Sequence, residues 1–234
     1  KTPPSIAPAL SAPPNAAGWV TGDTTVTFTC ADSGGSGIGA CSPPVTVGEG
    51  ASQPVTGTAT DVAGNTATVT VTVSVDKTPP SITAAITPAP NAAGWVSADA
   101  TVTFTCADSG SGVQSCPAPV TVTAEGGGQT ISGTAVDAAG NSATTSVTLN
   151  IDKTPASVTA MVEPAPNAAG WNNTDVTVTF ACQDAGAGVD GCPAAVPVSA
   201  EGANQVVSRT ATDRAGTQAT ASVSVSIDKA PPSI

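Results

Sequence analysis

The stretch Thr-Ala-Thr-Val-Thr-Val-Thr-Val-Ser-Val, residues 66–75, alternates hydroxyl and apolar side chains along its length. A period of two places the valines on one face of an extended chain and the hydroxyls on the other, which predicts a half-buried antiparallel strand. Residues 25–30, Thr-Val-Thr-Phe-Thr-Cys, share the pattern, and shorter runs occur at residues 5–10, 45–47 and 55–60. No window has a helical period, and Gly, Pro, Asn and Asp separate the runs. Six or seven short strands in about 76 residues indicate a two-sheet β-sandwich.

The chain consists of three copies of one unit. Lys-Thr-Pro-Pro-Ser-Ile begins at Lys1 and Lys77, and variants begin at Lys153 and Lys229, a spacing of 76 residues. Self-similarity at a fixed period is typical of repeat architectures. The expected domains are residues 1–76, 77–152 and 153–228, called repeats 1, 2 and 3 below, and residues 229–234 open a fourth repeat. Because the chain starts and stops at the same phase, we expect it to be a section of a longer array.

A second motif, Asn-Ala-Ala-Gly-Trp, keeps the same period and ends at Trp19, Trp95 and Trp171. With one Trp and one Phe in each repeat, the core of each unit is expected to be small.

The composition excludes several functions. The 234 residues contain no His and no Tyr, and 17 Asp and Glu against six Lys and Arg give a net charge of −11. Without His there is no imidazole base and no His metal ligand, and the negative charge disfavours nucleic acid as a partner. No apolar stretch is long enough for a membrane span in this segment. We expect no enzyme, because the acids recur at turns and few aromatic residues are present to hold a sugar for glycosidase chemistry.

One pair of cysteines in each repeat is expected to form a disulfide, because a unit this small needs a covalent staple. The pairs are Cys30 with Cys41, Cys106 with Cys116, and Cys182 with Cys192. Pairing within each repeat is the simplest connectivity, and a thiolate metal site is the alternative. Regular, even cysteines indicate an oxidising compartment, so we expect an extracellular or cell-surface location.

Three segments carry a resemblance to a known family. They are Asp-Lys-Thr-Pro-Pro from Asp76, Thr-Ala-Thr-Asp-Val-Ala-Gly-Asn at residues 58–65, and Cys-Ala-Asp from Cys30. Together they resemble the tandem bacterial Ig-like repeats, related in architecture to fibronectin type III, of bacterial surface proteins, adhesins and secreted enzymes. The resemblance implies an all-β array of three Ig-like sandwiches that serves as a spacer, a stalk or an adhesive module.

Aspartates at turns and junctions are the candidate binding residues. Asp-Val-Ala-Gly-Asn at Asp61 recurs in variant form at Asp137 and Asp213, and it is typical of a turn in which Asp accepts backbone N–H groups. The alternative joins Asp61 with Asp32 or Asp76 as oxygen ligands for Ca²⁺ at a domain end; no other cofactor is expected. The full set of turn or metal candidates is Asp32, Asp61, Asp76, Asp108, Asp137, Asp152, Asp184, Asp213 and Asp228.

The junction predicts a mechanical function. The prolines of Asp-Lys-Thr-Pro-Pro restrict the backbone between consecutive units, so we expect a semi-rigid connector and an elongated rod. We interpret the chain as a structural extracellular array: a stalk, spacer or filament segment of a bacterial surface protein. Its partners would be neighbouring repeats and, through edge strands, further copies of the chain. The alternative function is an adhesin that contacts carbohydrate or a surface, with Ca²⁺ as a cofactor.

Overall fold

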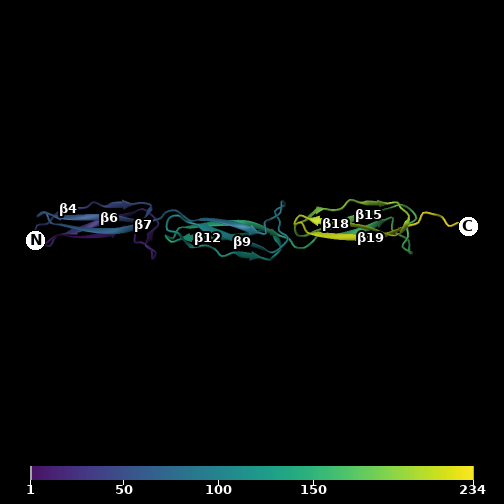
Figure 1. Cartoon of the computed structure of the whole chain (residues 1–234), viewed down its shortest axis with the longest axis horizontal. Coiled ribbons are helices and arrows are strands. Elements are labelled where there is room, and N and C mark those ends of the chain that lie inside the picture. Colours follow the sequence, from purple (N-terminus) through teal and green to yellow (C-terminus); the bar gives the residue numbers. More distant parts are fainter. Residues whose placement is uncertain (1, 234) are drawn as a thin grey trace. The chain divides into compact units, whose positions relative to one another are not determined.

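The computed structural model describes residues 2–233. Two residues lie outside the described residues. They are Lys1, which opens the first Lys-Thr-Pro-Pro motif, and Ile234, the last residue of the expected start of a fourth repeat. The described chain consists of strands and loops, so the all-β prediction is confirmed (Figure 1). In that part of the chain there is no helix long and apolar enough to cross a membrane.

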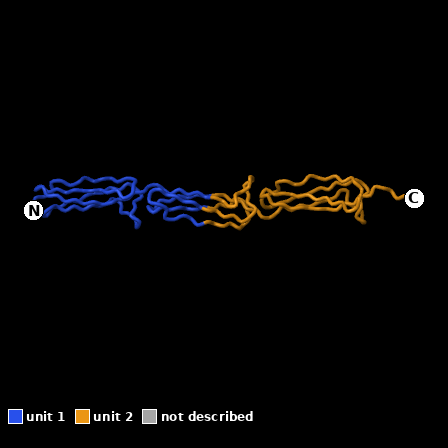
Figure 2. Tube along the Cα trace, viewed as in Figure 1, with its two compact units in different colours: residues 1–84, 104–118, 132–146 blue, residues 85–103, 119–131, 147–234 orange. Residues whose placement is uncertain are grey.

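The chain forms two compact units, and the division falls inside repeat 2 (Figure 2). Unit 1 consists of residues 1–84, 104–118 and 132–146, and unit 2 of residues 85–103, 119–131 and 147–234. The contacts between repeats 1 and 2 therefore lie inside unit 1, and those between repeats 2 and 3 lie inside unit 2. The domain boundaries after residues 76, 152 and 228 remain predictions from the period.

Repeat 1 forms two sheets. A three-stranded sheet has the order β1-β3-β5, and a four-stranded sheet has the order β2-β7-β6-β4. The strands of the first sheet are β1 (Ser5–Leu10), β3 (Thr24–Ala31) and β5 (Val45–Val47). Those of the second are β2 (Trp19–Val20), β4 (Ile38–Cys41), β6 (Gly50–Asp61) and β7 (Thr66–Val75). The alternating stretch at residues 66–75 is β7, and it pairs antiparallel with β6.

Repeat 3 has the same arrangement without a counterpart of β2, because Asn172 and Ile227 form only an isolated bridge. Its sheets have the orders β14-β15-β17 and β16-β18-β19. The strands are β14 (Ser157–Glu163), β15 (Val176–Gln183), β16 (Val189–Gly191), β17 (Val196–Val198), β18 (Gly202–Asp213) and β19 (Gln218–Ile227).

The strands of repeat 2 follow the same sequence order. They are β8 (Ser81–Thr87), β9 (Ala100–Ala107), β10 (Val113–Ser115), β11 (Val120–Val122), β12 (Gly126–Asp137) and β13 (Ser142–Ile151). Inside unit 1, β10 pairs antiparallel with the end of β12. Inside unit 2, β11 pairs antiparallel with the start of β9.

Each repeat has a small aliphatic core between its sheets. In repeat 1 the core consists of buried valines of β3, β5, β6 and β7, with Phe28 packed against them. Gly57 of β6 lies under the Phe28 ring, where a Cβ atom would collide with ring carbons, and Gly133 lies under Phe104 in the same way. The period-two pattern therefore selects the core face, and the glycines make room for the single phenylalanine.

Three disulfides lie outside these cores. They join Cys30 to Cys41, Cys106 to Cys116, and Cys182 to Cys192. Each links the end of a long strand (β3, β9 or β15) to the short strand or loop that follows, and so closes a loop at one end of its sandwich.

Candidate functional site: the joints between repeats

The aspartates at the ends of repeats 1 and 2 connect each of these repeats to the next; the contacts between two consecutive repeats are called a joint below. The N–H of Asp76 donates to the carbonyl of Val20 (3.0 Å), which fixes this residue to the end of repeat 1. Its carboxylate is fully buried: Oδ1 accepts the Thr78 N–H (3.0 Å) and Oδ2 accepts the Ser111 N–H of repeat 2 (2.6 Å). Asp76 therefore holds both the connector and a loop of the following repeat.

The joint between repeats 2 and 3 has the same geometry. Asp152 is 1% exposed, and its Oδ1 accepts the Thr154 N–H (3.1 Å). Its Oδ2 accepts the buried Ala187 N–H (2.5 Å) of repeat 3. Because a backbone N–H is the donor, Ala187 can stand where Ser111 stands in the first joint.

The receiving loop needs a glycine next to that contact. A Cβ atom on Gly110 would lie 2.5 Å from the carboxylate carbon of Asp76. Gly186 is equally close to Asp152 in the second joint. Asp108 folds the loop, since its Oδ2 accepts the N–H groups of Gly110 (3.1 Å) and Gly112 (2.7 Å).

The Asp-x-Ala-Gly-Asn turn lies at the same joint. Asp137 Oδ1 accepts the N–H groups of Gly140 (2.7 Å) and Asn141 (2.8 Å), as expected for a turn. The Asn141 amide donates to Asp137 Oδ2 (2.8 Å) and also to the carbonyl of Asp76 in the joint (3.0 Å). In repeat 3, Thr217 replaces this asparagine, and its hydroxyl donates to Asp213.

The Asn-Ala-Ala-Gly-Trp motif supplies the other half of the joint. Asn15 Oδ1 accepts the N–H groups of Ala17 (2.9 Å) and Trp19 (3.1 Å), which folds its own loop. Asn15 Nδ2 donates across the joint to the carbonyls of Ala138 (2.9 Å) and Ala139 (3.0 Å) in the turn of repeat 2. Two motifs that recur separately in the sequence thus bind each other in space.

The second joint repeats this contact, because Asn91 Nδ2 donates to the carbonyl of Arg214 (2.8 Å). Asn167, the third copy, accepts the same two loop N–H groups as Asn15. Within residues 2–233, no hydrogen bond from its Nδ2 across a joint is present.

The connector is also attached to the repeat that precedes it. The Lys77 N–H donates to Glu49 (2.9 Å), and Lys77 Nζ pairs with Asp23 (2.6 Å). The hydrogen bond that Lys77 Nζ donates to Asp23 raises the pKa of Lys77, and the one that Lys153 Nζ donates to Asp99 raises the pKa of Lys153. These side chains are about half exposed, so each pair contributes little stability.

Both joints bring three of the sequence-predicted aspartates together. In the part of the chain that the structure describes, the clusters are Asp76, Asp108 and Asp137, and Asp152, Asp184 and Asp213. Carboxylate oxygens within each cluster lie within 4.8 Å of one another. Carboxylate oxygens are ligands that Ca²⁺ prefers, but the hydrogen bonds above already give these oxygens N–H donors.

The other three predicted aspartates, Asp32, Asp61 and Asp228, lie outside these two clusters. Asp32 and Asp61 occupy the loop and turn of repeat 1 that correspond to Asp108 and Asp137. The pKa of Asp32 is lowered, and the main cause is the hydrogen bond that it accepts from the Gly34 N–H. The pKa of Asp61 is also lowered, and the main cause is the hydrogen bond that it accepts from the Asn65 side chain. Asp228 is exposed, and its Oδ1 accepts the Ala230 N–H (3.0 Å).

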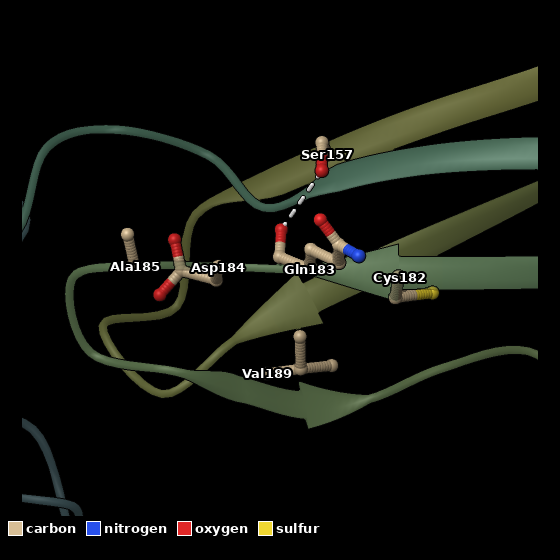
Figure 3. A pocket seen from close by; sticks show the side chains of 6 residues that line it. All are labelled: Ser157, Cys182, Gln183, Asp184, Ala185 and Val189. Carbon is tan, nitrogen blue, oxygen red and sulfur yellow. Dashed lines mark hydrogen bonds between the residues drawn. The ribbon is translucent and has the colours of Figure 1, made fainter.

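One pocket of unit 2 lies beside the disulfide loop of repeat 3 (Figure 3). It has a volume of about 580 Å³, and its six lining residues are Ser157, Cys182, Gln183, Asp184, Ala185 and Val189. The Ser157 hydroxyl donates to the Gln183 carbonyl (3.0 Å), and no lining side chain is aromatic. The pocket therefore has no ring on which a sugar could stack.

Comparisons with known proteins support the fold. No protein-family model matches the chain, and no curated protein matches it. The N-terminal eight Ig domains of the Down Syndrome Cell Adhesion Molecule match at 12% identity with a TM-score of 0.51, over 94% of this chain and 36% of that one. The chain thus spans about a third of that structure's length, and the match shows an Ig-like repeat fold.

Two further structures are similar at lower scores. A 1.5-MDa bacterial ice-binding adhesin matches at 17% identity with a TM-score of 0.39, over 97% of this chain and 100% of that one. SGBP-B of the Bacteroides ovatus mixed-linkage glucan utilization locus, in complex with a mixed-linkage heptasaccharide, matches at 11% identity with a TM-score of 0.20, over 97% of this chain and 71% of that one. The sheets of the chain and the match to the Ig domains of the cell adhesion molecule define its class, a tandem array of Ig-like β-sandwich repeats.

Proposed function

We propose that the chain is a non-catalytic, extracellular structural array, a stalk or spacer of the bacterial surface type that its sequence resembles. In this function the recurrent motifs set the geometry between consecutive repeats. The disulfides support the extracellular location, because such bonds persist in oxidising compartments. The expected partners are the neighbouring repeats of the same chain.

The observation that carries the proposal is the two-sided attachment of each connector. Asp76 is held by the carbonyl of Val20 on one side and by the Ser111 N–H on the other. Asn15 adds two hydrogen bonds across the same joint. A freely jointed linker would need none of these contacts, because its polar groups would be hydrated.

Substitution of Asn15 by Asp tests the proposal. Asn15→Asp keeps the oxygen that folds its own loop but replaces the amide donor with a carboxylate facing the carbonyls of Ala138 and Ala139. Spin labels on non-natural amino acids at the exposed Thr68 and Ser142, both in unit 1, should give a narrow distance distribution in the parent chain and a broad one in the variant.

The matched control is Asn167→Asp, which makes the same change in the third copy of the motif. It should leave the distance distribution unchanged, because Asn167 contributes nothing to the joint between repeats 1 and 2. A broad distribution in the parent chain would contradict the proposed fixed joint.

A second candidate function, a Ca²⁺-dependent adhesin, is favoured by one observation. Three carboxylates lie within 4.8 Å of one another at each joint, and the three ion pairs of the described chain involve other aspartates. Ca²⁺ bound there would offset their mutual repulsion and raise the melting temperature of the full chain. A melting temperature that is the same in millimolar Ca²⁺ and in EDTA, with no binding on a glycan array, would leave the structural array as the function.

A further inference from the structure

We propose that the disulfides of repeats 2 and 3 each serve the joint with the preceding repeat, so that reducing such a disulfide loosens the joint while the repeat stays folded. The proposal rests on the proposed function, since it requires joints that are fixed in the oxidised chain. It assigns Cys106–Cys116 to the joint between repeats 1 and 2, and Cys182–Cys192 to the joint between repeats 2 and 3.

The disulfides are poorly placed to support a core. None of the three hydrophobic clusters of the described chain contains a cysteine. Cys116 and Cys192 are exposed, and their partners Cys106 and Cys182 are half-buried. A soluble reductant can therefore reach the bonds, and their loss opens no cavity between the sheets.

Besides the disulfide, a few hydrogen bonds and one short strand hold the loop that it closes. Asp108 Oδ2 accepts the N–H groups of Gly110 and Gly112, and the Gly112 carbonyl accepts the Ala138 N–H (2.9 Å). In repeat 2, residues 108–112 contain no strand, and β10 (Val113–Ser115) is only three residues long. β10 pairs with β12 at two positions, with a register shift between them. Closure of a loop with a sequence separation of 10 restricts this segment far more than one short, irregular strand does.

This loop makes the contacts that receive the preceding repeat. The Ser111 N–H binds the carboxylate of Asp76, and the Ser111 hydroxyl accepts the Ala139 N–H (3.0 Å). Ala139 in turn offers its carbonyl to Asn15. The loop thus contacts Asp76 of repeat 1 directly and Asn15 of repeat 1 through Ala139.

The chemical step is thiol–disulfide exchange with a dithiol reductant. The dithiol supplies two electrons and two protons, the Cys106–Cys116 S–S bond breaks to give two thiols, and the reductant becomes a cyclic disulfide. The freed segment of about ten residues regains backbone entropy, and this entropy competes with the single hydrogen bond from Ser111 to Asp76.

The test replaces both members of one pair in the full chain. In Cys106→Ser/Cys116→Ser, amide hydrogen exchange at Ser111 should accelerate about tenfold or more. Exchange at Ala187, in the other joint, and at Leu149, in the core of repeat 2, should stay as in the parent. The distance distribution between labels at Thr68 and Ser142 should broaden.

Repeat 1 supplies a matched control. Cys30→Ser/Cys41→Ser removes the equivalent disulfide from a loop that receives no preceding repeat within residues 2–233. It should change neither Ser111 exchange nor the distance distribution.

The outcomes separate this inference from the proposed function. Faster exchange at Leu149 together with Ser111 would show a disulfide that stabilises the whole repeat, and unchanged exchange at Ser111 would show one without a role in the joint; either result overturns the inference. A distribution that is already broad in the oxidised parent would instead contradict the fixed joint on which the proposed function depends.

Discussion

At the residue scale, Asp76 shows how one side chain can organise a joint. A buried carboxylate is stable only when hydrogen bonds replace the water it has lost, and Asp76 obtains them from Thr78 and Ser111. This arrangement requires a glycine at position 110, because no Cβ atom fits beside the Asp76 carboxylate.

We expect Gly110→Ala to lower the stability of the joint by about 1–3 kcal/mol, because the methyl group and the Asp76 carboxylate would compete for one space. Calorimetry of the full chain measures the effect. Gly22→Ala is the control, because nothing lies within 4 Å of a Cβ atom added at this position. The melting temperature of this variant should equal that of the parent chain or exceed it slightly. Equal melting temperatures for the two variants would show that Gly110 is not needed for close approach.

The depressed carboxyl pKa values predict a loss of stability in acid. Burial raises the pKa of Asp76, but hydrogen bonds led by Ser111 outweigh burial and lower it; the pKa values of Asp32 and Asp61 are lowered too. A group with a lowered pKa in the folded state stabilises that state above its unfolded pKa of about 4 and loses this contribution as the pH falls through the folded value. The melting temperature should therefore be nearly constant from pH 7 to about pH 5 and fall below about pH 4. A melting temperature that rises on acidification below pH 4 would contradict this assignment.

Part of the joint was predictable at this scale. Asp-x-Ala-Gly-Asn predicts a turn in which Asp accepts N–H groups, and the hydrogen bonds of Asp137 have that form. That Asn15 donates to this turn in the next repeat was not predicted from the sequence. A strict period shows that the units are alike, but it does not show which surface of one meets which surface of the next; the recurrence of Asn15 as Asn91 was the available signal.

At the element scale, strands form where hydroxyl and apolar side chains alternate in the sequence. β7 covers the whole stretch at residues 66–75, whereas β6 begins at Gly50, ahead of the pattern at residues 55–60. β6 extends because Gln53 and Pro54 pair with β7, with a register shift after Gly50. Pairing of this kind depends on the neighbouring strand and is not visible in one segment alone.

The core of each repeat should be sensitive to single truncations, because it is small. Leu149 of β13 is fully buried, and we expect Leu149→Ala to cost about 2–5 kcal/mol in the free energy of unfolding. Met161→Ala is the control, because Met161 on β14 is 60% exposed and should cost little. Chemical denaturation of the full chain measures both, and a comparable loss in the two variants would contradict the assignment of the core.

At the scale of the whole molecule, the joints determine whether the repeats act together or as separate domains. The joint between repeats 1 and 2 lies inside unit 1, and that between repeats 2 and 3 lies inside unit 2. In each, the same three contributions recur: a buried aspartate, an asparagine that crosses to a turn, and a lysine that returns to the preceding repeat. Under the proposed function, we expect such a chain to transmit the orientation of one repeat to the next through hydrogen bonds and not through proline stiffness alone.

Residual dipolar couplings of the oxidised full chain test this claim most directly. Amides of residues 5–75 and amides of residues 104–118 and 132–146 all belong to unit 1 and lie on opposite sides of the first joint. A fixed joint predicts that one alignment tensor fits both sets. Two tensors of clearly different magnitude would show that the repeats reorient independently and would contradict the account.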